Sequence, residues 1–218
     1  MNHEFWHQSW QRGEIGFHLD CDHPQLLANF DRLQAKPDEV IFVPLCGKSR
    51  DLAWLAEQKL QVVGIELSPL AIQAFFDEHG LQPEREDLGD LQLWRAGAIR
   101  IYCGDFFALR QQHLQGSRLV YDRAALMALP PQVRRDYAAR LTEWMPSGGR
   151  MLLISNSYDQ QLIDGPPFSV PAGEIEQLYG TAFDIEMLSS KEMIDAHPGL
   201  RQRGLDSFVA ETFLLEKR

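Results

Sequence analysis

The sequence VIFVPLCGKSRDLAWLAEQKLQVVGIE, residues 40–66, decides the fold of this chain. It opens with a short apolar run at 40–45, continues through a helical spacing of apolar residues at 49–58, and leads into a second apolar run at 60–67. Runs of this length without polar alternation are typical of strands that are buried on both faces. A strand, a helix and a second strand in this order predict two parallel strands joined by a crossover helix.

The same alternation continues on both sides of this stretch. Further strands are expected at 98–103, 117–122, 149–155, 183–189 and 208–216, and helices at 24–33, from Pro69 to just before Gly80, at 132–145 and from Ala172. The last two strands are joined by a link without a long helix, which favours an antiparallel edge. We therefore predict an α/β fold with a doubly wound, mostly parallel, seven-stranded sheet and an antiparallel last strand.

Size and composition limit what the chain can be. Its 218 residues suit one domain, and the sequence contains no linker or repeat that would divide it. The net charge of −10 argues against a nucleic-acid or membrane partner, because phosphates and anionic lipids attract a basic face. The three cysteines, Cys21, Cys46 and Cys103, do not form a disulfide framework, and no signal peptide or apolar span is recognisable. We expect a cytoplasmic protein.

Ligands of doubly wound sheets bind beyond the carboxyl ends of the strands, so the residues there are the first candidates for a site. The first strand ends in the turn Leu45-Cys46-Gly47, where a glycine lets the backbone approach a ligand. Glu66 ends the second strand, about twenty residues after Leu45, and an acidic side chain there can accept hydrogen bonds from both hydroxyls of a ribose. The sequence therefore predicts a nucleoside site at Gly47 and Glu66.

Two later strand ends add further candidates. Asp105 and Phe106 follow the third strand, where the carboxylate can accept from the amine of an adenine and the ring can supply an apolar wall; Asp105 can equally cap a helix. Arg123 follows the fourth strand. Its guanidinium can bind a carboxylate through two hydrogen bonds, or form a salt bridge with Asp122 or Glu66.

Other chemistries fit the sequence less well. His18, Cys21 and His23 lie close together, but no second cluster with metal spacing accompanies them, so we expect no metal site. Cys46 has no suggestively placed histidine to activate it and is interpreted as a packing residue. A nicotinamide-dependent dehydrogenase would share the ribose acid, although the Gly-x-Gly-x-x-Gly run is missing. A non-catalytic protein that senses a nucleoside without turnover is a second alternative.

Five motifs resemble the thiopurine S-methyltransferase family in its bacterial form: FVPLCGKS (42–49), VVGIELS (62–68), IYCGDFF (101–107), YDRAAL (121–126) and SYDQQLIDGPPFSVP (157–171). Of these, PLCGK and GPPF-x-VP are the specific signals. The resemblance covers the chain essentially end to end. It implies the Rossmann-like fold of S-adenosylmethionine-dependent methyltransferases in a single domain, 1–218, whose residues 1–35 form a segment that covers cofactor and substrate.

The resemblance also implies roles for individual residues. Those expected at the cofactor S-adenosylmethionine are Trp10, Leu45, Gly47, Glu66, Asp105, Phe106 and Arg123. Phe17 would border the acceptor pocket, and Arg201 or Arg203 would bind the acceptor. Trp6 matches a second tryptophan of the family, and the sequence does not decide whether Trp6 or Trp10 stacks on the cofactor.

The implied reaction transfers a methyl group to a thiopurine, to another aromatic or heterocyclic thiol, or to a selenium or tellurium compound. Such a transfer requires an in-line arrangement, and a thiol that is already ionised needs no strong general base. Arg123 is the expected catalytic residue, because a cation favours the anionic acceptor. We expect a monomer that acts on small molecules, with no nucleic acid or membrane as partner.

Overall fold

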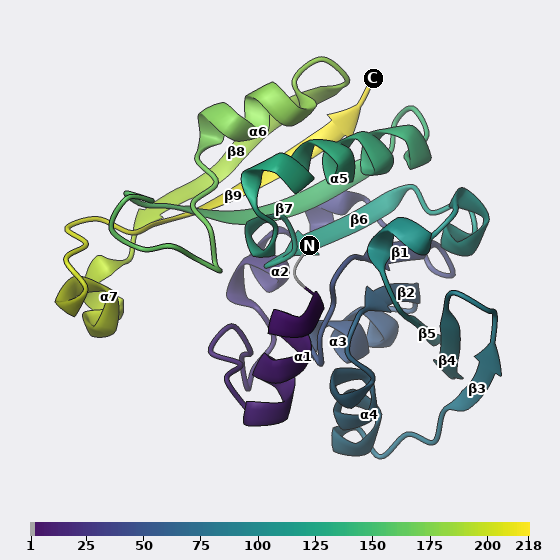
Figure 1. Cartoon of the computed structure of the whole chain (residues 1–218). Coiled ribbons are helices and arrows are strands. Elements are labelled where there is room, and N and C mark those ends of the chain that lie inside the picture. The colour runs from purple at the N-terminus through teal and green to yellow at the C-terminus, as the bar shows by residue number, and fades with distance from the viewer. Residues whose placement is uncertain (1–2) are drawn as a thin grey trace. The chain divides into compact units, whose positions relative to one another are not determined.

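The computed structural model describes residues 3–218 and divides them into two compact units. The N-terminal unit ends at Tyr121, and the C-terminal unit runs from Asp122 to Arg218. The N-terminal unit is coloured purple to teal in Figure 1, and the C-terminal unit teal-green to yellow. The single domain expected for residues 1–218 stays a prediction, and its first two residues lie outside the described part of the chain.

Parallel strands form the centre of the N-terminal unit: β1 (Val40–Val43), β2 (Gln61–Glu66), β5 (Ile99–Cys103) and β6 (Leu119–Arg123), whose last two residues belong to the C-terminal unit. β1 pairs with β2 and β6, and β5 pairs with the other edge of β2. Most of their side chains are buried, as the unbroken apolar runs predict. Since these strands run parallel, the residues after β1, β2 and β5 meet at one edge of the sheet.

Two helices of the N-terminal unit lie on β2 and β5, α3 (Asp51–Glu57) and α4 (Pro69–Glu78). α4 begins where the sequence predicts, because the Ser68 hydroxyl accepts a hydrogen bond from the Ala71 N–H at 3.4 Å and Pro69 takes the first position. The predicted helix at 24–33 consists of α2 (Pro24–Asn29) and the 3-10 turn η1 (Phe30–Leu33). The other helical segments of this unit are α1 (His3–Arg12), η2 (Phe106–Ala108) and η3 (Gln111–Leu114).

The N-terminal unit also contains two strands that the sequence pattern does not reveal, β3 (Glu84–Asp87) and β4 (Gln92–Ala96). They extend the sheet by antiparallel pairing, in the order β3-β4-β5-β2-β1-β6. β3 reads ERED and is fully exposed, so it has no apolar alternation that would mark it as a strand. Its Arg85 lies 3.6 Å above the centroid of the Trp94 ring, and this contact across the hairpin replaces a buried face.

The C-terminal unit contains the antiparallel sheet β7-β9-β8, formed by β7 (Arg150–Ser157), β9 (Val209–Lys217) and β8 (Phe183–Glu192). The antiparallel last strand is therefore confirmed. The helices α5 (Pro131–Trp144) and α6 (Ala172–Tyr179) lie along this sheet in Figure 1 and contact each other. The turn η4 (Leu126–Ala128) precedes α5.

The link between β8 and β9 is more structured than the sequence predicts. It contains the 3-10 turn η5 (Ile194–Ala196) and the five-residue helix α7 (Pro198–Gln202), which lie at the end of the β8–β9 ribbon in Figure 1. A small separate core holds this segment, formed by Ile163, Ile194, Leu205 and Phe208. Within residues 3–218, every helix is too short or too polar to cross a lipid bilayer.

Candidate functional site

The turn after β1 has a backbone shape that few sequences adopt. Leu45 and Gly47 both have positive φ, 45° and 54°, and the Cys46 N–H donates to the Ile65 carbonyl of the neighbouring strand at 3.0 Å. A positive φ is unfavourable for leucine, so the surrounding sheet must hold the turn in this shape. Cys46 is buried, and burial raises the pKa of its thiol well above the ordinary value, which agrees with a packing role.

Glu66 connects the ends of the first two strands. Its side chain is 6% exposed; Oε2 accepts from the Gly47 N–H at 2.9 Å and Oε1 accepts from the Ser68 N–H at 2.7 Å. Burial raises the pKa of this carboxyl, while the hydrogen bonds from Ser68, Gly47 and Leu67 act in the opposite direction. Each carboxylate oxygen keeps a second lone pair, so Glu66 can accept from a ligand without releasing the turn.

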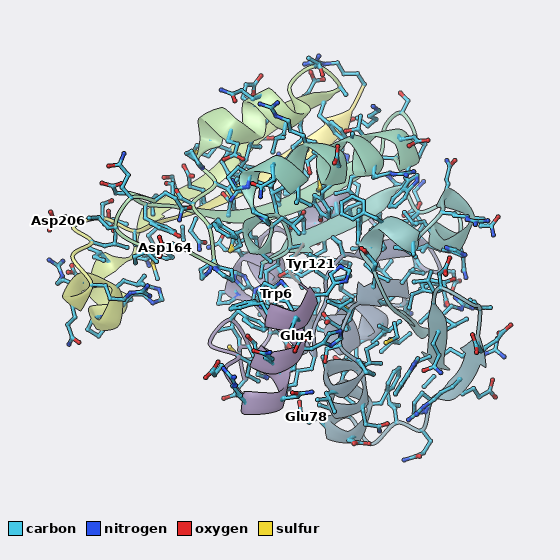
Figure 2. All side chains as sticks on the ribbon, in the orientation of Figure 1. Glu4, Trp6, Glu78, Tyr121, Asp164 and Asp206 are labelled. Atoms are coloured by element: carbon cyan, nitrogen blue, oxygen red, sulfur yellow. The ribbon has the colours of Figure 1, made fainter. Side chains whose placement is uncertain are left out.

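Aromatic side chains from the N-terminal segment lie against the same turn. A Cβ atom at Gly47 would be 3.2 Å from Cζ2 of Trp10, so the indole packs directly on this glycine. The Phe17 ring makes edge contacts with both Trp10 and Trp6, with centroids 5.7 Å apart in each pair. Trp6 projects from α1 in Figure 2 and also contacts Phe5. Of the two tryptophans, Trp10 is therefore the one that contacts the turn.

Asp105 and Phe106 follow β5 at the same sheet edge. The Asp105 Oδ1 atom accepts from the Phe107 N–H at 2.9 Å and caps η2, and its Oδ2 atom lies 3.2 Å from Nε2 of His3. The Phe106 ring is 1% exposed and lies 6.5 Å from the Phe42 ring, centroid to centroid. Asp105 therefore caps η2, as the sequence allows, and the Phe106 ring is part of the buried core.

In the C-terminal unit, Arg123 ends β6 and is half-buried. The preceding Asp122 is fully buried; it accepts from the Tyr137 hydroxyl at 2.6 Å and from the Leu126 N–H at 3.1 Å. Burial raises the pKa of Asp122 to about 6, against the effect of those hydrogen bonds. Asp122 therefore ties the loop after Arg123 to α5.

The two arginines expected at the acceptor lie at α7. Arg201 is exposed, and its Nη2 atom is 2.5 Å from Oδ1 of Asp195. Arg203 follows the helix and is also exposed. An arginine whose nearest partner is an exposed aspartate is free to exchange that partner for a ligand, because surface ion pairs are weak.

Sequence reasoning missed two buried polar groups. Asp51 is 2% exposed and accepts from the Tyr121 hydroxyl and the His23 N–H, at 2.9 and 2.8 Å. Arg134 is fully buried and pairs with Glu174. The signal for Arg134 was available, because it occupies the first position of the apolar stripe of α5, followed by Tyr137, Ala138 and Leu141.

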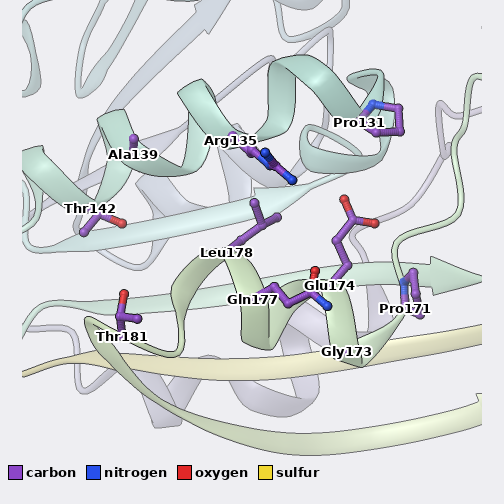
Figure 3. Close-up of a pocket in the computed structure, with 10 residues that line it drawn as sticks. All are labelled: Pro131, Arg135, Ala139, Thr142, Pro171, Gly173, Glu174, Gln177, Leu178 and Thr181. Carbon is purple, nitrogen blue, oxygen red and sulfur yellow. The ribbon is translucent and has the colours of Figure 1, made fainter.

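A groove runs between α5 and α6 of the C-terminal unit (Figure 3). Its lining residues are Pro131, Arg135, Ala139, Thr142, Pro171, Gly173, Glu174, Gln177, Leu178 and Thr181. None of the residues predicted to bind cofactor or substrate lines it. Among residues 3–218, no three histidine, cysteine or acidic side chains are grouped as a metal site would require.

Comparison with known proteins decides the family. The family model described as thiopurine S-methyltransferase matches residues 1–218. The chain belongs to the thiopurine S-methyltransferase family. It is 44% identical over 219 residues to thiopurine S-methyltransferase of Nitrosospira multiformis, covering 100% of this chain and 99% of the relative. It is 42% identical over 217 residues to thiopurine S-methyltransferase of Pseudomonas aeruginosa, covering 100% of both chains.

The fold is also that of methyltransferases. The structure of 1,6-didemethyltoxoflavin-N1-methyltransferase from Burkholderia thailandensis, solved with S-adenosylhomocysteine, aligns with a TM-score of 0.62 at 14% identity, over 99% of this chain and 87% of that one. The predicted doubly wound, Rossmann-like fold is confirmed. The chain is an S-adenosylmethionine-dependent methyltransferase, which sets aside the dehydrogenase and the non-catalytic sensor. The buried acceptor Glu66 beside the side-chain-free Gly47 suits the ribose of this cofactor.

Proposed function

We propose that the strand ends of the N-terminal unit hold S-adenosylmethionine, with Glu66 accepting from the ribose hydroxyls beside Leu45 and Gly47. The supporting observation is the Glu66 carboxylate fixed at 2.9 Å from the Gly47 nitrogen, because this places an acceptor and an open backbone together. Trp10 covers the turn from α1. Asp105 and Phe106 border the adenine, with the buried Phe106 ring supporting Asp105 from below.

The acceptor in this proposal is a thiopurine or another aromatic or heterocyclic thiol. The aromatic cluster Trp6, Phe17 and Trp10 supports it, because such rings stack on flat apolar molecules and this cluster contacts the Gly47 turn. Phe17 borders the acceptor, and Arg201 and Arg203 bind its polar edge. Selenium and tellurium compounds are included, because their anions are soft nucleophiles like a thiolate.

When bound, S-adenosylmethionine supplies a methyl group on a sulfonium, which the acceptor sulfur displaces in line. The residues of the chain contribute by positioning the acceptor and excluding water, and orientation of this kind is worth roughly 7–11 kcal/mol. Arg123 favours the ionised acceptor by its charge, so no residue is required to remove a proton in the same step. Asp159, a conceivable base, instead accepts from the Gln161 N–H at 3.0 Å and forms a turn.

An acceptor screen tests the substrate class. The protein is incubated with methyl-labelled S-adenosylmethionine and aromatic thiols, aliphatic thiols, selenite or selenol compounds, and tellurite. We expect label in the aromatic thiols at the lowest acceptor concentrations. Label only in selenium or tellurium products would replace the thiol proposal, and label in no sulfur, selenium or tellurium product would overturn it.

A variant tests the role of Arg123. We expect Arg123→Ala to lower kcat by roughly 100-fold, and most strongly below the pKa of the thiol, where the cation must favour ionisation. Arg140→Ala is the matched control, because Arg140 is an exposed arginine on α5 whose nearest acid is Glu143 at 3.9 Å. Wild-type turnover of Arg123→Ala across the pH range would remove Arg123 from the catalytic machinery.

Location, assembly and the covering segment complete the proposal. The acidic composition and three unpaired cysteines favour a cytoplasmic monomer. Residues 1–35 cover the cofactor and the substrate in this proposal, and the contact of Trp10 with Gly47 supports it. Sedimentation at several protein concentrations tests whether the protein is a monomer. Hydrogen exchange of residues 1–35 with and without cofactor tests whether this segment covers the cofactor.

A further inference from the structure

The guanidinium of Arg134 is a buried charge in the C-terminal unit, on the first turn of α5. Its side chain is 1% exposed; Nε donates to the Leu129 carbonyl at 2.9 Å, and Nη1 lies 2.7 and 2.8 Å from the two carboxylate oxygens of Glu174. Glu174 reaches from α6 towards the start of α5 in Figure 3. Burying a charge is costly, so a buried arginine is kept where the arrangement that it fixes matters.

Arg134 contacts two loops of the same unit. The first loop, 124–130, follows Arg123, and Arg134 holds it through the Leu129 carbonyl. The second loop, 158–171, follows β7 and leads into α6, which carries Glu174. The two loops are joined directly, because the Phe168 N–H donates to the Met127 carbonyl at 2.7 Å. Arg134 and this hydrogen bond therefore form a clamp between the two loops.

The ring of Phe168 lies close to Arg134 and to Gly165. The guanidinium carbon of Arg134 lies 5.7 Å from the ring centroid, within the range of a cation–π contact. The ring also packs on Gly165, where a Cβ atom would be 2.6 Å from Cδ1 of Phe168 and φ is +77°. Arg134 Nη2 is buried and has no hydrogen-bond acceptor among the described residues, so the aromatic face is the partner that remains to it.

We propose that Arg134 is a positioning residue for the methyl acceptor: it fixes the Phe168 ring and the loop after Arg123, and so sets the KM for the acceptor. Both loops begin at carboxyl ends of strands, where substrates of such folds bind. The Phe168 side chain is half-buried, so part of its ring is open to a flat acceptor. The inference rests on the proposed function, because it concerns the acceptor of that reaction.

The experiment compares Arg134→Gln, Arg134→Lys and Glu174→Gln with the wild type. We expect Arg134→Gln to raise the KM for an aromatic thiol about 10-fold, since small misplacement of a substrate-positioning group is costly. The calorimetric Kd for S-adenosylmethionine should change less than about twofold. Lysine keeps the positive charge but lacks the planar guanidinium that contacts both oxygens of a carboxylate. We therefore expect the KM of Arg134→Lys for the acceptor to lie between those of the wild type and Arg134→Gln.

Arg135→Gln is the matched control, because Arg135 is the next residue on α5 but is exposed and lines the outer groove. We expect it to leave KM and kcat unchanged. Hydrogen exchange gives a readout that does not depend on the acceptor. Arg134→Gln and Glu174→Gln should speed exchange of the Phe168 amide, and Arg135→Gln should not.

The outcomes separate this inference from the proposed function. If no sulfur, selenium or tellurium acceptor is methylated by the wild type, the proposed function fails, while faster exchange at Phe168 in Arg134→Gln would still support the clamp. Unchanged exchange and unchanged KM in Arg134→Gln would overturn the inference. An equal loss of cofactor affinity and acceptor affinity would also overturn it, because a general structural role predicts that result. If Arg134→Gln does not fold, Glu174→Gln must show the same pattern: a raised KM for the acceptor with a nearly unchanged Kd for S-adenosylmethionine.

Discussion

The turn at Gly47 and the clamp at Arg134 are two polar arrangements that fix loops at strand ends, and they do so in opposite ways. Glu66 holds its turn by accepting from backbone N–H groups of residues next to it in the sheet. Arg134 holds its loops by a buried ion pair between the first turns of two helices. The first arrangement leaves acceptor lone pairs for a ligand. The second leaves a buried donor, Nη2 of Arg134, without an acceptor, and the guanidinium carbon lies 5.7 Å from the centroid of the Phe168 ring. The two arrangements therefore differ in which atoms remain without a hydrogen-bond partner: acceptor lone pairs at Glu66 and a buried donor at Arg134.

The largest effect expected in either unit is on the cofactor site. Glu66→Ala removes the proposed ribose acceptor and leaves the Gly47 and Ser68 N–H groups without their present partner. Hydrogen bonds to a charged group are each worth about 1.5–3 kcal/mol, so the Kd for S-adenosylmethionine should rise roughly 1,000-fold by calorimetry. Glu66→Gln keeps the shape of the side chain, and its Kd for S-adenosylmethionine should rise about 30-fold.

Glu78→Gln is the control, because Glu78 contacts Lys48 at the exposed end of α4. An Ala variant of Glu66 that folds and binds the cofactor with wild-type affinity would contradict the role of Glu66. It would also remove the contrast between the Glu66 and Arg134 arrangements.

The next effect is pH-dependent and belongs to the C-terminal unit. The buried Asp122 has a pKa of about 6 in the folded chain and an ordinary value of 3.8, so the folded state binds the extra proton between these values. The contribution of Asp122 to stability should therefore be fully present below pH 3.8, be lost as the pH rises through about 6, and stay constant above that. The difference corresponds to at most about 3 kcal/mol.

Chemical denaturation of the wild type and Asp122→Asn at several pH values measures this contribution. The free energy of unfolding of the Asn variant should not show this decrease as the pH rises through about 6, because an asparagine side chain does not titrate. Parallel stability curves for both proteins from pH 4 to 7 would show that Asp122 does not titrate as expected.

A third prediction concerns the contact between Gly47 and Trp10. Gly47→Ala must adopt φ +54° and displace the indole, which lies 3.2 Å from the new Cβ. We expect about a 10-fold loss of cofactor affinity. Gly80→Ala has a similar φ of +64° but no atom within 4 Å, so it measures the backbone term alone, as a loss of stability without loss of affinity.

The smallest effect is expected at the end of the β8–β9 ribbon. Hydrogen bonds from the Ser207 hydroxyl and the Phe208 and Ile194 N–H groups lower the pKa of Glu192 to about 2. Its contribution to stability is present above pH 4.5 and is lost as the pH falls towards 2. Glu192→Gln should therefore lower the melting temperature slightly at pH 7 and by less at pH 2.5. Equal shifts at both pH values would contradict this assignment.

Seven of the strands and the position of Glu66 follow from the sequence, because apolar runs and acids at strand ends leave local signals. β3 leaves none: its residues Glu84–Asp87 are charged and exposed, and it forms only because β4 offers an unpaired edge. Phe106 differs from β3, because the sequence predicts it as an apolar wall of the ligand site, but only the structure shows that its side chain is 1% exposed.

The sequence by itself determined the alternation of strands and helices, the sheet edge at which we propose that the cofactor binds, and the family. These depend on periodicity and on motifs, which are local along the chain. Only the tertiary structure decided that Trp10 rather than Trp6 lies on the Gly47 turn, and that Arg134 meets Glu174 forty residues away. Such contacts depend on how helices and loops pack, and packing joins residues whose separation along the chain carries no signal.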